Sequence, residues 1–221
     1  MITDPWFYAA AVPAVLLFGI AKGGFGGGLG VLAVPLMALV ISPLQAAAIL
    51  LPILCLMDLV GLWAYRGRWV WPELRILVPA SMLGILAGTL LFGFMSAATV
   101  RIIVGLVAIV FTLHYVYSTR HRLDSALPDF PPAVGMAAGA AGGFTSFIAH
   151  SGGPPISMYL LRRPLDRTDF VATTVLLFAA INYVKLLPYG WLGQLSTGNL
   201  VTSLVLAPLA PIGVYTGVWL H

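Results

Sequence analysis

Gly19 to Met37 reads GIAKGGFGGGLGVLAVPLM, and this stretch decides how the rest of the chain is interpreted. It lies in an apolar run, yet its nineteen residues include seven glycines, a proline and Lys22. Because glycine is a poor helix former, we expect two short half-helices that meet at an unwound glycine segment. Such a segment presents free backbone N–H groups and a partly positive helix N-terminus. At membrane depth this backbone is tolerated only where it is buried in protein or lines a polar cavity, so the stretch predicts an anion site.

A second interpretation assigns the same glycines to helix packing. Small residues four positions apart let two membrane helices approach closely. Pairs with this spacing include Gly19/Gly23, Gly23/Gly27 and Gly26/Gly30. Packing alone leaves Lys22 unexplained, so we keep it as the alternative to the anion site.

The composition indicates a multi-pass, all-α membrane protein. The chain has 221 residues, of which 60% are hydrophobic and 8% charged, and its mean hydropathy is +1.00. Soluble domains carry roughly 25% charged residues. The net charge of +4 comes from arginines that flank apolar segments, which is typical of membrane topology signals and predicts no nucleic-acid partner.

Apolar runs of about 17–25 residues mark the expected membrane segments. The seven segments are a broken hairpin at Tyr8–Ile41, spans at Gln45–Trp63, Ile76–Phe94 and Val100–Tyr117, a second broken segment at Ala133–Leu161, and spans at Phe170–Tyr189 and Leu200–Leu220. They divide the chain into a first repeat (1–118), a cytoplasmic linker (119–132) and a second repeat (133–221). The span at Val100–Tyr117 has no counterpart after Leu220, so a final helix is expected to be missing.

Short motifs recur in the same order in the two halves. Gly23–Phe25 is repeated as Gly142–Phe144, and each is expected to open a glycine-rich break. The proline and glycine pattern of Pro79–Gly88 recurs at one fixed offset in Pro208–Gly217. These matches predict an internal repeat.

Arginines predict that the two repeats have opposite orientations. The loop with Arg66, Arg68 and Arg75 and the linker with Arg120 and Arg122 lie two crossings apart, so both are expected in the cytoplasm. The loop with Arg162, Arg163 and Arg167 joins them if the second hairpin returns to its own side. The uncharged loop at 41–46 and the N-terminus with Asp4 are expected outside. This arrangement is typical of inverted-repeat transporters whose discontinuous helices meet near the membrane midplane.

Both lysines of the chain, Lys22 and Lys185, fall inside apolar segments. Ionisable groups at this depth usually face a cavity or pathway, and two buried cations favour an anionic ligand. The alternative for Lys185 is that it reaches the nearby end of its span. Asp58 is expected either to pair with Lys22 or to take a coupling proton.

The second break, GGFTSFIAHSGGPPISM, adds hydroxyls, free N–H groups and His150, which can coordinate an oxyanion or carry a proton. The alternative for His150 is a neutral ring satisfied by backbone carbonyls. The candidate substrate-binding residues are Lys22, Gly24, Phe25, Gly26, Gly27, Gly28, Thr145, Ser146, His150, Ser151, Gly152, Gly153 and Lys185, with Asp58 and His150 as candidates for coupling. The sequence contains no CxxC, HExxH, Walker A or G-x-S-x-G motif, so we expect no enzyme activity, no metal site and no cofactor.

AKGGFGGGLGVLAVPLM near the N-terminus and GGFTSFIAHSGGPPISMYLL in the second half resemble the TauE/SafE family of sulfite and organosulfonate permeases. The resemblance extends over nearly the whole chain. It implies a carrier of small sulfur-containing anions, such as sulfite or sulfoacetate, in the bacterial inner membrane. The matched residues are Lys22 with Gly23–Gly28, and Thr145, Ser146 and His150–Pro154. Members of the family usually have about one more C-terminal helix.

The expected mechanism is alternating access, with proton coupling as a possible addition. Lys22 and the half-helix N-termini would hold the sulfur oxyanion, and Phe25 would meet an organic tail. Two alternatives remain open, namely a passive anion channel and a membrane scaffold or assembly subunit. Glycine pairs such as Gly84 and Gly88 would permit a homodimer in the lipid bilayer.

Overall fold

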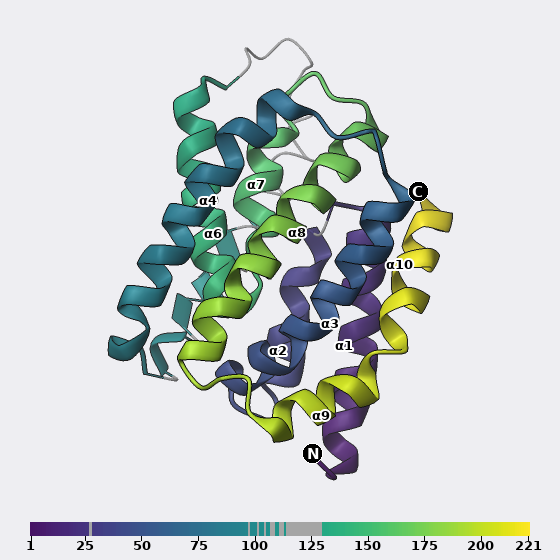
Figure 1. Cartoon of the computed structure of the whole chain (residues 1–221), viewed down its shortest axis with the longest axis vertical. Helices are drawn as coiled ribbons and strands as arrows, with labels where there is room; N and C mark the ends of the chain where they lie inside the picture. The colour runs from purple at the N-terminus through teal and green to yellow at the C-terminus, as the bar shows by residue number, and fades with distance from the viewer. Residues whose placement is uncertain are drawn as a thin grey trace.

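The computed structural model describes residues 1–26, 28–96, 98–100, 102, 103, 105, 106, 109, 110, 113 and 130–221. All regular elements within these residues are helical (Figure 1). Most of the predicted span Val100–Tyr117 and of the linker 119–132 lies outside them, as do Gly27, Arg120 and Arg122. Each of the other six predicted membrane segments corresponds to at least one helix.

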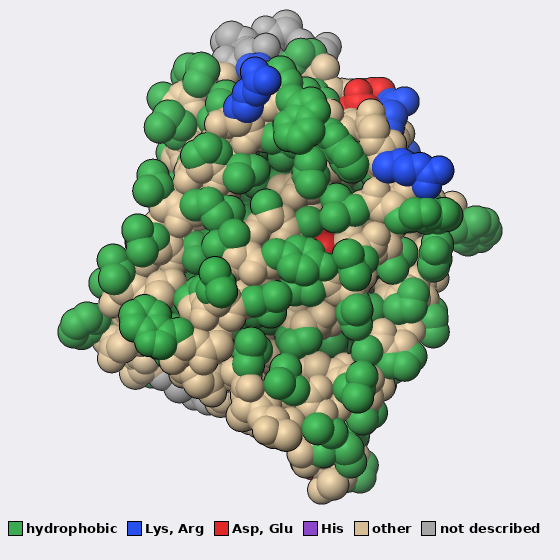
Figure 2. Space-filling view, in the orientation of Figure 1, with side chains coloured by type: hydrophobic (Ala, Val, Ile, Leu, Met, Phe, Trp, Pro, Cys, Tyr) green, Lys and Arg blue, Asp and Glu red, His purple; other side chains and the backbone are tan. Residues whose placement is uncertain are grey.

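Five helices in the described part of the chain are long and apolar enough to cross a membrane. They are α1 (Pro5–Gly24), α3 (Pro43–Ala64), α4 (Trp71–Leu91, extended to Phe94 by η2 at Phe92–Phe94), α6 (Pro132–Ala149) and α8 (Arg167–Trp191). Their outward faces carry exposed leucines and tryptophans, and hydrophobic side chains cover most of the face seen in Figure 2. The protein is therefore a multi-pass membrane protein.

The sixth candidate span is bent. The sequence predicts one helix at Leu200–Leu220, but the structure has α9 (Thr197–Leu206) and α10 (Leu209–Leu220) with an angle of 45° between them. Pro208 lies in the break, and because proline lacks an N–H and crowds the preceding turn, a straight helix cannot continue through it.

Helix starts follow local capping signals. Asp4 accepts a hydrogen bond from the Trp6 amide at the start of α1, and Ser42 accepts one from the Gln45 amide at the start of α3. Both caps precede a proline at the first helical position, where the missing N–H costs nothing. Asp166 caps α8 in the same way through the Asp169 amide.

The first broken segment differs from the two half-helices expected from its glycines. α1 is a full 20-residue helix that runs through Gly19, Gly23 and Gly24, and the chain turns only at Gly26, whose φ is +64°. It then returns through η1 (Gly28–Leu32) and the short α2 (Ala33–Met37). The break does lie beside Lys22, two residues beyond it, as expected, but the element before it is a full-length helix and not a short half-helix.

Packing explains why α1 continues. α10 lies against it, and a Cβ at Gly19 would come within 2.8 Å of the Gly213 Cα atom. A Cβ at Gly23 would collide with the Val214 carbonyl oxygen. The close approach of the two helices offsets the poor helix propensity of these glycines, as the packing alternative anticipated.

The second broken segment, Ala133–Leu161, coincides with two helices, but the break within it begins later than Gly142, where the sequence placed it. α6 continues through Gly142, Thr145 and Ser146 to Ala149, and the break begins at His150, whose φ is +53°. α7 (Gly153–Leu160) then carries the chain back. α6 packs closely on α4, since a Cβ at Gly139 would lie 2.9 Å from the Leu77 carbonyl oxygen.

Contacts show that the two hairpins open toward opposite ends of the molecule. Arg163, after α7, donates to the Phe130 carbonyl before α6, so the second hairpin returns to its own end. The first hairpin leads to Gln45, which bonds Asn199 near the start of α9, while the Ile2 amide bonds Thr202. The N-terminus, α2 and α9 accordingly lie at one end in Figure 1.

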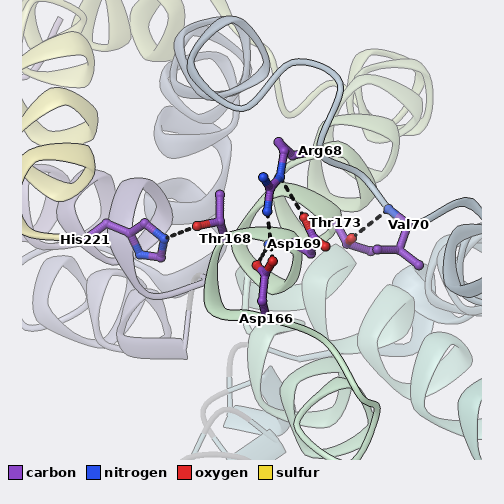
Figure 3. Close-up of polar contacts among 7 residues, drawn as sticks. All are labelled: Arg68, Val70, Asp166, Thr168, Asp169, Thr173 and His221. Carbon is purple, nitrogen blue, oxygen red and sulfur yellow. Dashed lines mark hydrogen bonds and ion pairs between the residues drawn. The ribbon is translucent and has the colours of Figure 1, made fainter.

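The arginine-bearing loops meet at the other end. Arg68 Nε lies 2.8 Å from Asp169 and Arg68 Nη2 lies 2.8 Å from Asp166 (Figure 3). Arg163 Nε lies 2.7 Å from Glu73. The blue side chains and most of the red surface visible in Figure 2 lie at this end, which we call the arginine end. This confirms the prediction that the loops after α3 and after α7 share an end.

Candidate functional site

Both lysines lie in the protein core. Lys22 comes from the last turn of α1 and is 3% exposed, and Lys185 comes from α8 and is 0% exposed. Lys185 therefore does not extend along its helix to the membrane surface. A buried ammonium group needs partners that replace its lost hydration, so the partners of each lysine decide what it can do.

Lys22 is neutralised by a carboxylate. Its Nζ atom lies 2.5 Å from Asp58 Oδ1, and Asp58 projects from α3 with no exposed surface. Asn182 of α8 donates from Nδ2 to the other carboxylate oxygen at 2.8 Å. Both oxygens of Asp58 are thus engaged, and the pairing of Lys22 with Asp58 that the sequence suggested is confirmed.

Lys185 has only neutral partners. Its Nζ atom donates to the Ser146 carbonyl oxygen and to Ser146 Oγ, both at 3.0 Å, and lies 2.7 Å from His150 Nδ1. Among the described residues no carboxylate lies within ion-pair distance of it. With Lys185 protonated and His150 neutral, the group formed by Lys22, Asp58, Lys185 and His150 carries one more positive than negative charge.

The contacts of His150 fix its tautomer. An ammonium group has no acceptor, so Lys185 must donate to Nδ1 of a neutral ring. The proton then lies on Nε2, which donates to the Ala47 carbonyl oxygen of α3 at 2.8 Å. The backbone at His150 is left-handed, which turns the side chain from the end of α6 toward α3 and α8. This matches the neutral, carbonyl-bound histidine that the sequence left open as an alternative.

A small cavity lies among these groups. Its volume is about 10 Å³, which is room for about one water molecule. The lining residues are Phe18, Lys22, Leu54, Ser146, His150, Gly153, Phe178 and Asn182. Phe178 covers Lys22, whose Nζ lies 6.0 Å from the ring centre. An anion larger than water requires the helices around this cavity to move apart.

The structure brings some predicted residues to this cavity and places others elsewhere. The predicted residues that line it are Lys22, Ser146, His150 and Gly153. Lys185 does not line it but contacts two lining residues, Ser146 and His150. Thr145 and Ser151 are adjacent, but their hydroxyls donate to backbone carbonyls, namely Ala141 and Ser151 for Thr145 and Ala149 for Ser151.

The remaining predicted glycines do not line this cavity. Gly24 and Phe25 line a separate cavity at the arginine end, which we call the vestibule. Gly26 is covered by the Phe170 ring, and Gly28 begins η1. Gly152 packs against Ser146 and Phe178. Because Pro154 and Pro155 have no N–H, the amide hydrogens at the start of α7 belong to Gly152 and Gly153.

Phe18, Leu54, Phe178 and Asn182 line the cavity without having been predicted as site residues. The three apolar side chains give no signal in an apolar sequence. Asn182 does give one, because a buried amide three residues before Lys185 shares a face of α8 with it. The sequence of α8 alone does not reveal that Asn182 binds Asp58 of α3.

A family profile described as "Sulfite exporter TauE/SafE" matches residues 11–221 of the chain. No curated protein and no solved structure matches it with statistical significance. Proteins of this family are membrane transporters rather than enzymes, and the family implies the export of sulfite or related sulfur-containing anions. With almost its whole length matched, the chain belongs to the TauE/SafE sulfite exporter family.

Proposed function

We propose that the protein carries sulfite, sulfoacetate or another small organosulfonate across the bacterial inner membrane by alternating access. The observation that carries this proposal is the environment of Lys185, a fully buried amino group whose partners among the described residues are all neutral. A buried charge of this kind is costly unless a ligand of opposite charge visits it. In this proposal Ser146, His150 and the Gly152 and Gly153 amides would complete the shell around an oxyanion.

The small volume of the cavity favours a carrier over a passive channel. An open anion channel needs a continuous polar path, whereas the space beside Lys22 and His150 holds about one water molecule. A carrier passes through an occluded conformation of this type between its two open ones. The proposed substrate enters when the cavity opens toward one end and leaves when it opens toward the other.

Inverted repeats, 1–118 and 133–221 around the linker 119–132, would supply the two opposite openings. Hairpins that open toward opposite ends support this proposal. So does the helix packing, because the glycines of α4 contact α6 while the corresponding glycines of α10 contact α1. We place the arginine end in the cytoplasm by the positive-inside rule.

His150 and Asp58 are the proposed coupling groups. Protonation of either would change the charge of the cluster by one, which would link anion binding to a proton. Anion movement would then respond to a pH gradient as well as to the anion gradient.

Counterflow in proteoliposomes tests the proposal. Vesicles loaded with unlabelled sulfite should accumulate labelled sulfite transiently when they contain the wild-type protein, and Lys185→Met should abolish this accumulation. Downhill flux without counterflow would indicate a channel. No movement of sulfite, sulfoacetate or taurine by folded protein would contradict transport and favour a scaffold.

A further inference from the structure

The second cavity of the molecule, the vestibule, lies at the arginine end. Its volume is about 420 Å³, within the range of roughly 300–1,000 Å³ typical of small-molecule sites. The lining residues are Gly24, Phe25, Leu160, Leu161, Arg163, Leu165, Asp166, Arg167, Phe170, Val171, Leu220 and His221. The vestibule thus combines apolar walls with two guanidinium groups.

The charged groups of the vestibule differ in how they are paired. Arg163 is bound to Glu73 at 2.7 Å, and Asp166 is bound to Arg68 at 2.8 Å (Figure 3). Arg68 also contacts Asp169, which does not line the cavity. Arg167 lines the cavity, and no carboxylate of the described residues lies within ion-pair distance of it.

The vestibule and the lysine cavity share two helices. At the end of α1, Lys22 lines the inner cavity while Gly24 lines the vestibule. Along α8, Phe170 lines the vestibule and Phe178 lines the inner cavity. Phe170 and Phe178 are eight positions apart along α8, which corresponds to a helical rise of about 12 Å. Phe170 rests on Gly26, where even a Cβ would not fit beneath its ring, so the ring and the turn after α1 form part of the barrier between the two cavities.

We propose that the vestibule is an outer docking site for organosulfonates, used before the anion reaches the buried lysines. Arg167, and Arg163 next to it, attract the sulfonate group, since guanidinium groups match the geometry of oxyanions. Phe25, Leu165 and Phe170 receive the carbon skeleton. An inorganic oxyanion has no apolar part for these walls, so the site favours an organosulfonate over sulfate. This inference rests on the proposed function for its place on the transport path.

Accessibility of an introduced thiol tests the docking site. Leu161 lines the vestibule and is 71% exposed, and the chain's one cysteine, Cys55, is buried, so Leu161→Cys adds one reactive thiol to a low background. In purified protein, a methanethiosulfonate with a sulfonate group should modify it several-fold faster than one with a trimethylammonium group. Propane-1-sulfonate should slow the reaction at concentrations where sulfate does not.

Two charge-removing variants separate docking from general electrostatics. Arg167→Gln should abolish both the preference for the anionic reagent and the protection by propane-1-sulfonate. Arg66→Gln removes the same charge from the same end but not from the cavity lining, and should keep both effects. Equal rates for the two reagents, or identical behaviour of the two variants, would overturn the docking site.

Counterflow on the same preparations distinguishes this inference from the proposed function. Protection without counterflow of any sulfur anion would keep the docking site and reject the carrier. Counterflow without protection would reject the docking site and keep the carrier.

Discussion

Lys22 and Lys185 are buried in the same core, yet their surroundings are electrostatically opposite. Lys22 is held by a carboxylate whose second oxygen is bound by Asn182. Lys185 is held by a hydroxyl, a carbonyl and a neutral imidazole. Lys22 and Asp58 neutralise each other without a ligand. Protonated Lys185 keeps a positive charge that an anionic ligand can neutralise. Partner identity, more than depth in the membrane, therefore distinguishes a lysine that holds helices together from one that can bind an anion.

Replacement of Lys185 should have the largest effect on function. Lys185→Met removes the uncompensated charge, so binding of sulfite should weaken about 10- to 150-fold, because a charge-assisted hydrogen bond contributes roughly 1.5–3 kcal/mol. The thermal unfolding temperature should stay the same or rise, because an apolar side chain of similar length replaces a buried charge. Binding titrations and thermal unfolding in detergent measure the two effects. If Lys185→Met instead unfolds at a lower temperature and still binds sulfite, Lys185 stabilises the fold and does not bind the anion.

Replacement of Lys22 should act mainly on stability. Lys22→Met leaves Asp58 buried without its cation, which is expected to lower the free energy of unfolding by about 3–5 kcal/mol. Adding Asp58→Leu removes the orphaned carboxylate and should restore most of the loss. Thermal unfolding of the single and double variants checks this. If the second substitution restores nothing, the pair is not the unit that the structure indicates.

Smaller changes at the partners sharpen the same contrast. Ser146→Ala removes one acceptor from Lys185 but keeps the carbonyl, so it should alter sulfite affinity by roughly five-fold, which corresponds to about 1 kcal/mol, with little change in stability. Asn182→Leu removes the donor to the buried Asp58 carboxylate and should lower stability by about 1–3 kcal/mol, with a smaller effect on affinity. Sulfite affinity and thermal stability should be measured for both variants. A loss of stability in Ser146→Ala together with a loss of affinity in Asn182→Leu would contradict these assignments.

The exposed ion pair at the arginine end should show the smallest effect. The pKa of Asp166 lies below its ordinary value of 3.8, chiefly because the Asp169 amide donates to it and further because Arg68 lies beside it. A lowered folded-state pKa adds stability above the ordinary value, and that stability is lost as the pH falls through the lowered pKa. Unfolding temperatures from about pH 5 to about pH 3 should therefore fall slightly less in Asp166→Asn than in wild type. A larger fall in the variant would contradict this sign.

The sequence predicted the helical segments well because their signals are local. Apolar length placed six segments, each of which corresponds to at least one helix. The charge pattern correctly put the loops of Arg68 and Arg163 at one end. These properties depend on residues close together in the chain.

The sequence failed where distant contacts outweigh local preference. Glycine's low propensity suggested a short half-helix before the break, but α10, almost 200 residues later, packs on Gly19 and Gly23 and stabilises a full-length α1 up to Gly24. Sequence reasoning gave Lys22 the leading role in binding, whereas our proposal gives it to Lys185. That distinction depends on which partner each lysine reaches through the fold, and neither α1 nor α8 reveals it alone.

Sulfite titration of two purified variants tests whether Lys185 or Lys22 holds the anion. One carries Lys185→Met, and the other carries Lys22→Met with Asp58→Leu, which removes the neutral ion pair as a unit. We expect the variant with Lys22→Met and Asp58→Leu to keep most of the wild-type affinity for sulfite and the Lys185→Met variant to lose it. Loss of binding in the pair variant, with wild-type affinity in Lys185→Met, would show that Lys22 holds the anion and would contradict the account.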